Sequence, residues 1–160
     1  MKIYDLDKFI ESIFEIPDEA PLQANQWLSI TKVFAEAIAS ADDLLLIEVQ
    51  SDRYGDCHPY LQICYEDDGA MTIEAVSNRF LTPPLSLDAQ NTMFELGWGL
   101  SDESNLPNYF IFLHNEDARP EVVAELFTRT LHLAYGIQVD DPIEISTARG
   151  VWSDDDSKTL

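Results

Sequence analysis

The stretch that decides the fold is PYLQICYEDDGAMTIEAVSNRFLTPPLSLDAQNTMFELGW, residues 59–98. It contains two segments of alternating apolar and polar residues, 60–65 and 71–76, and this alternation is typical of half-buried strands. The sequence Asp-Asp-Gly at 67–69 separates them and supplies a glycine that can adopt a positive φ. Together these features predict a β-hairpin.

A break and a helix follow the hairpin. Pro83 and Pro84 lack the N–H group that a strand ladder needs, so the chain must turn away from the sheet there. Ser86 is a suitable N-cap, and Gly97 can end the helix in the left-handed conformation. The sequence therefore predicts a short helix between these two residues.

Apolar residues at helical or strand spacing continue on both sides of this stretch. They predict helices at 4–14 and 22–40, a buried strand at 44–50, a strand at 109–113, a helix capped by Asp117 that ends at Gly136, and an edge strand within 139–147 in which Ile143 and Ile145 face the same way.

These elements define a fold class and one domain. Because a tight turn can only join antiparallel strands, we expect an α+β fold, a two-layer sandwich in which an antiparallel β-sheet has helices packed on one face. A chain of 160 residues fits a single domain, which we place at 1–150. Residues 151–160 are expected to form an acidic, mobile tail, because its three consecutive aspartates repel one another.

The charge balance restricts the class of partner. Thirty Asp and Glu residues against nine Lys and Arg give a formal net charge of −21. Such a surface repels phosphate backbones and anionic lipid headgroups, so neither nucleic acid nor a membrane is an expected partner. The acidity favours a basic peptide or protein, whose approach it would accelerate; the alternative is that it only keeps the protein soluble.

The N-terminal segment and the two cysteines indicate the cellular compartment. The N-terminal segment MKIYDLDKFIESIF mixes charged and apolar residues, which predicts neither a signal peptide nor a membrane span. The two cysteines, Cys57 and Cys64, indicate a reduced, cytoplasmic protein.

No catalytic, cofactor-binding or metal-binding residue is predicted. Cys57 and His58 beside Asp56 form the nearest candidate cluster, but a second pair of ligands at short spacing is missing. A calcium loop, a glycine-rich phosphate loop and a nucleophile elbow are absent from the sequence as well. A hydrolase that uses Asp56, His58 or the carboxylates around them is therefore the least favoured interpretation, and we expect a protein that is not an enzyme.

Four short segments carry a family resemblance: PYLQI at 59–63, IEAVSNRFL at 73–81, ELGW at 95–98 and PNYF at 107–110. In this order and spacing the chain resembles, over about residues 44–135, the actinobacterial branch of the YbjN and type III secretion chaperone-like proteins. The resemblance implies a compact α+β domain, often dimeric, that holds peptide segments of partner proteins. It transfers no individual site residue.

The expected function is therefore a non-catalytic chaperone-like or adaptor domain. It would capture an apolar or basic peptide against its sheet or in the groove beside its helices. Tyr54, Phe80, Trp98 and Tyr109 are the candidate partner-binding residues of an exposed apolar patch, although Trp98 could instead lock its helix to the sheet. The alternative is a homodimeric structural or regulatory protein, joined through its sheet edge or long helices and without a peptide client.

Overall fold

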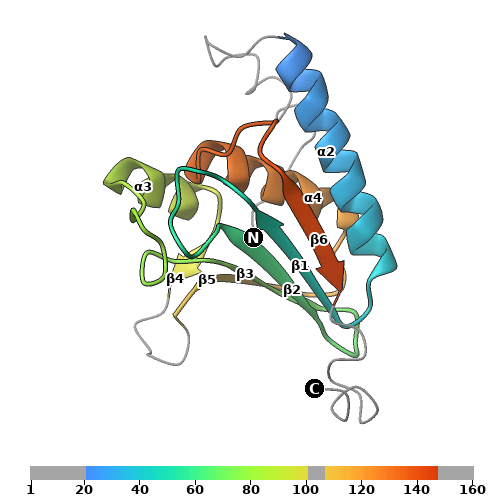
Figure 1. The fold of residues 1–160 in the computed structure, drawn as a ribbon. Coiled ribbons are helices and arrows are strands. Elements are labelled where there is room, and N and C mark those ends of the chain that lie inside the picture. Colours follow the sequence, from blue (N-terminus) through green and yellow to red (C-terminus); the bar gives the residue numbers. More distant parts are fainter. Residues whose placement is uncertain (1–20, 101–106, 148–160) are drawn as a thin grey trace, which may run out of the picture.

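The computed structural model describes residues 21–100 and 107–147, with side chains from residue 25 onward (Figure 1). The predicted helix at 4–14 and the predicted tail at 151–160 lie outside the described residues. The elements in chain order are α2 (Pro21–Ser40), β1 (Leu44–Val49), β2 (Tyr60–Tyr65), β3 (Met71–Ala75), α3 (Leu87–Glu95), β4 (Gly99–Leu100), β5 (Tyr109–Leu113), α4 (Pro120–Arg129), the π-helix η1 (Thr130–Ala134) and β6 (Ile143–Thr147).

The strands form one six-stranded sheet in the order β4-β5-β3-β2-β1-β6. Every neighbouring pair is antiparallel, so the predicted fold class is confirmed. The hairpin of β2 and β3 pairs Ile63 with Ile73 at its centre, and Gly69 in its turn has a φ of +88°. The predicted C-terminal edge strand is β6, which pairs with β1 and lies at one end of the sheet.

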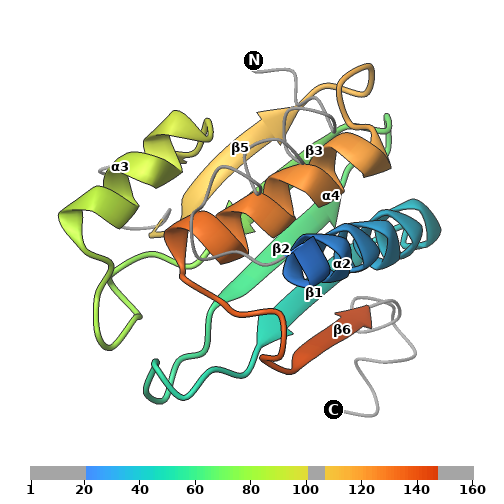
Figure 2. The ribbon, with the colours of Figure 1, turned by 90° about the horizontal axis from the view of Figure 1, so that it is seen from above.

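The helices cover a single face of the sheet, the inner face (Figure 2). There α4 crosses the middle of the sheet, α2 lies beside it toward β1 and β6, and α3 lies on the opposite side of α4. Alternate residues of β1, β2 and β3 are buried on this face, as the alternating pattern requires. The largest fully buried side chains are Trp27, Tyr109, Tyr135, Phe34, Phe127, Ile38, Leu45, Ile47, Leu61 and Ile63.

Buried and half-buried hydroxyl groups join the helices to one another and to the sheet. The Oγ1 atoms of Thr31 in α2 and Thr128 in α4 are 2.8 Å apart. Tyr65 at the end of β2 donates its hydroxyl to the carbonyl of Ile38 at 2.7 Å. Because each of these polar atoms has a partner, the helical layer can pack closely without leaving an unsatisfied group at these contacts.

The predicted caps of α3 are confirmed, whereas the predicted N-cap of α4 is not. Ser86 caps α3 by accepting the Ala89 N–H at 3.1 Å, and Gly97 takes a φ of +105° after it, both as predicted. The prediction that Asp117 caps α4 was wrong, because α4 begins at Pro120 and its N-cap is Arg119, without a side-chain cap. Proline at the first helical position already has a helical φ and needs no N–H partner.

Candidate functional site

The four sequence-predicted binding residues do not form one exposed patch. Phe80 is 42% exposed and Tyr54 is half-buried, with its hydroxyl donating to the Tyr135 carbonyl at 2.6 Å. Trp98 and Tyr109 are only 2% and 1% exposed, so both belong to the core. The expectation of an exposed patch that includes these two residues was therefore wrong.

Packing explains the burial of both aromatic residues. Trp98 follows the glycine that ends α3 and donates its indole N–H to Thr130 Oγ1 at 3.0 Å, so it locks α3 to η1. Tyr109 lies in β5 opposite Ala75 of β3, on the face that the helices cover. Its ring meets Phe94 edge-to-face at 5.9 Å between centroids. These contacts agree with a structural role for Trp98.

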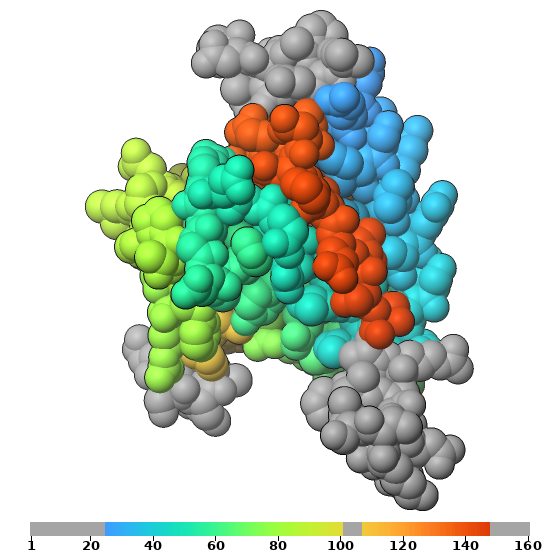
Figure 3. All heavy atoms as spheres, viewed as in Figure 1, coloured from blue at the N-terminus to red at the C-terminus, as the bar shows by residue number. Residues whose placement is uncertain are grey.

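The outer edge of β6 is free of any strand among the described residues. In an antiparallel pair, alternate residues direct both backbone groups toward the partner strand. The carbonyl of Pro142 accepts the Gln50 N–H of the β1 side at 2.9 Å, so Glu144 and Ser146 also direct their backbone groups toward β1. The N–H and C=O groups of Ile143, Ile145 and Thr147 therefore point away from the sheet. Figure 3 shows β6 on the molecular surface with α2 along one side.

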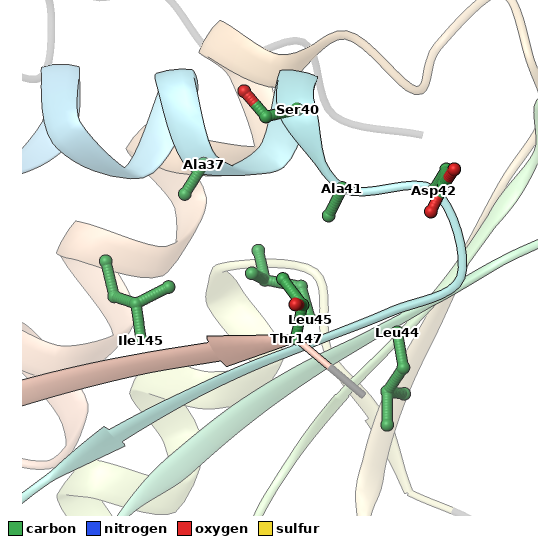
Figure 4. A pocket seen from close by; sticks show the side chains of 8 residues that line it. All are labelled: Ala37, Ser40, Ala41, Asp42, Leu44, Leu45, Ile145 and Thr147. Atoms are coloured by element: carbon green, nitrogen blue, oxygen red, sulfur yellow. The ribbon is translucent and has the colours of Figure 1, made fainter. Parts of the chain in front are cut away.

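A cavity of about 220 Å³ lies between this edge and α2. In Figure 4 the side chains of Ala37 and Ala41 point from the helical side toward the sheet, and Leu45 and Ile145 point from the sheet toward α2. The small alanines leave the space that a larger side chain would fill. The lining residues are Ala37, Ser40, Ala41, Asp42, Leu44, Leu45, Ile145 and Thr147.

The second face of the sheet, the outer face, is mixed apolar and acidic. Its rows of cross-strand neighbours include Leu46 beside Gln62 and Gln62 beside Glu74, and Gln62 donates to the Glu74 carboxylate at 3.1 Å. No described strand contains a Lys or Arg. The residues on this face are Leu44, Leu46, Glu48, Tyr60, Gln62, Cys64, Thr72, Glu74, Phe110, Phe112, Glu144 and Ser146.

The carboxylates give the outer face a negative potential. Glu48 and Glu144 stand directly opposite each other on β1 and β6, an arrangement that is destabilising for like charges. Burial raises the pKa of the Cys57 thiol, and the Glu48 carboxylate raises that pKa further. Burial likewise raises the pKa of Cys64, with Glu74 and Glu66 adding to the effect. Both thiols therefore stay protonated near neutral pH and are poor nucleophiles.

A second cavity, of about 240 Å³, lies where the loop after β1 meets η1 and the start of α3. Contacts in and beside this cavity hold these segments together. The Arg53 guanidinium lies over Gly136, where an added Cβ would come within 2.7 Å of the Arg53 Nη2 atom. Gly55 donates its N–H to the Thr82 carbonyl at 2.6 Å and so ties this loop to the proline segment.

The described residues contain neither a metal-binding cluster nor a membrane-spanning helix. Within 21–100 and 107–147, no group of three or more His, Cys, Asp or Glu side chains could hold a metal ion. In the same part of the chain no helix is long and apolar enough to cross a membrane.

Sequence reasoning predicted a groove beside the helices but assigned none of the residues that line this cavity to it, although the sequence contains two signals for them. The pattern of 139–147 placed Ile143 and Ile145 on one side of an edge strand. Ala37 and Ala41 are spaced four residues apart, which puts two small side chains on one helical face. What the sequence did not contain was the pairing of β6 with β1, which brings Ile145 below these alanines.

Comparison with known families now assigns the class of protein. Residues 21–148 match a family described as T3SS (YopN, CesT) and YbjN peptide-binding chaperone 3, TY-Chap3. The match covers most of the chain, so the protein belongs to this family and the sequence-based resemblance is confirmed. Searches of curated proteins and of solved structures found no match.

Proposed function

We propose that this protein is a non-catalytic, chaperone-like protein that holds an extended segment of a partner protein at the free edge of β6. The observation that carries the proposal is the position of this edge, whose outward backbone groups border the mostly apolar cavity below α2. Membership of a peptide-binding chaperone family supports it.

The geometry suits the addition of a strand. The outward N–H and C=O groups of Ile143, Ile145 and Thr147 can form main-chain hydrogen bonds with an added strand. Such bonds give affinity that does not depend on the side chains of the bound segment. Side chains of the added strand that face inward would enter the cavity and supply specificity. We further propose that the protein acts in the cytoplasm, where Cys57 and Cys64 remain free thiols.

Site-specific photo-cross-linking in the native host tests this proposal. A photoreactive amino acid at Ser146, on the exposed side of β6, should cross-link to a defined segment of one or a few proteins, identified by mass spectrometry. The same group at Asn91, an exposed position of α3, should not.

A pair of variants at Thr147 shows whether the edge itself is used. Thr147→Pro removes an outward N–H and leaves the ladder with β1 intact, so it should abolish the cross-link. Thr147→Val keeps the N–H and should retain it. A cross-link that survives Thr147→Pro contradicts the proposal. A cross-link between two copies of the chain would favour the homodimeric alternative instead.

A further inference from the structure

A strand added to β6 would place its side chains in two different environments. Successive side chains alternate between the faces of a sheet. The residue opposite Ile145 would face α2, and the residue opposite Glu144 would lie on the outer face. Sequence preference therefore depends on what each face offers.

The inner environment is mostly apolar and has room, with Ser40, Asp42 and Thr147 as the polar residues of the lining. Ala37, Ala41 and Ile145 line a cavity of about 220 Å³, and a cavity of about 150 Å³ is enough to hold benzene. An aliphatic side chain placed beside Ala37, Ala41 and Ile145 would lose its exposure to water against an apolar wall.

The outer environment is anionic. A residue added beside Glu144 would have its Cβ about 4.5–5.5 Å from the Glu144 Cβ, and Glu48 follows in the same row. Within the described part of the chain, Glu48 accepts the Gln50 side-chain amide, a neutral donor, at 3.0 Å. The carboxylates are unmatched by any Lys or Arg on the described strands.

We infer that the segment bound at β6 alternates apolar side chains, which enter the cavity below α2, with Lys or Arg side chains, which pair with Glu144 and Glu48. This inference rests on the proposed function and names the chemistry of the partner. An acidic segment would place further negative charge beside two opposed glutamates. A second copy of this chain would bring another net charge of −21 to the same edge, so a basic segment of another protein is the better occupant.

Three synthetic peptides of about nine residues, the length of a long strand, test the inference. Each alternates Val with Lys, with Gln or with Glu, and its binding is measured by fluorescence anisotropy in about 150 mM NaCl, which screens long-range attraction. We expect the Val-Lys peptide to bind about tenfold more tightly than the Val-Gln peptide, and the Val-Glu peptide to bind most weakly.

Two matched double variants separate local pairing from the general acidity of the protein. Glu48→Gln with Glu144→Gln should remove the preference for Val-Lys over Val-Gln. Asp88→Asn with Glu95→Gln removes the same charge from exposed positions of α3 and should leave the preference unchanged. An equal loss in both double variants would overturn the inference.

The Thr147→Pro variant distinguishes failure of the inference from failure of the proposed function. If Val-Lys and Val-Gln bind the unchanged protein equally and Thr147→Pro abolishes both, the edge binds strands without selecting charge, and only the inference fails. If no peptide binds, or Thr147→Pro changes nothing, the edge is not the binding site and both fail.

Discussion

At the scale of single residues, Tyr65 joins α2 to the sheet and links stability to pH. Burial, with a smaller effect of Asp42, raises the pKa of Tyr65 from 10.0 to about 12. Folding therefore favours the neutral hydroxyl, which donates to the Ile38 carbonyl. This contribution is fully present below about pH 10 and is lost as the pH rises through about 12.

We expect Tyr65→Phe to lower the free energy of unfolding at pH 7 by about 1 kcal/mol, because one hydrogen bond is lost. The variant should also lose less stability than the unchanged protein between about pH 10 and 12. Urea unfolding at a series of pH values measures both effects. An identical alkaline decline in the two proteins would show that Tyr65 does not contribute to it.

The aromatic residues of β5 show why the sequence alone could not predict which side chains are exposed. The segment YFIFL contains only aromatic and aliphatic side chains, with no charged residue to identify the solvent side. Tyr109 lies on the covered face, whereas Phe110 and Phe112 lie on the outer face. Only the pairing of β5 with β3 decides between these arrangements, so the candidate residue chosen from this segment was the buried one.

At the scale of elements, the contribution of a helix cap to stability can be measured by comparing Ser86, which caps α3, with Asp117, which does not cap α4. Ser86→Ala removes the side-chain acceptor for the Ala89 N–H, and we expect it to lower the free energy of unfolding by about 1 kcal/mol. Asp117→Ala should change it by less than about 0.5 kcal/mol, because Asp117 does not cap α4. Chemical denaturation of both variants measures the difference. A larger loss in Asp117→Ala would contradict the assignment of the caps.

Elements with local signals were predictable, and elements set by tertiary contacts were not. The hairpin, α2, α3 and β6 follow from periodicity, turns and caps within each segment. The two-residue strand β4 is defined by its pairing with β5, in which Gly99 lies opposite Phe110 and close to its ring. The π-helix η1 has no comparable local signal, and its first residue, Thr130, is held by Trp98 from another element.

At the scale of the whole molecule, the sequence predicted the protein family but not the candidate binding site at β6. The order of segments and four short sequence matches indicated the family, and residues 21–148 match it. The candidate edge and cavity depend on contacts between segments about 100 residues apart, such as Ile47 with Ile145. Strand order and helix placement create this surface, so no segment contains it alone.

Because the net charge is −21, added salt should have opposite effects on the stability of the protein and on its affinity for a basic peptide. Mutual repulsion destabilises the compact state, and salt screens it over a Debye length of about 8 Å at physiological ionic strength. Raising NaCl from about 20 to about 300 mM should therefore stabilise the protein by about 1 kcal/mol, an increase of about 2–4 °C in the midpoint of thermal unfolding. Binding of the Val-Lys peptide should weaken over the same range, because salt also screens attraction. If the midpoint rises while peptide affinity stays constant, the acidity serves solubility and not the choice of partner.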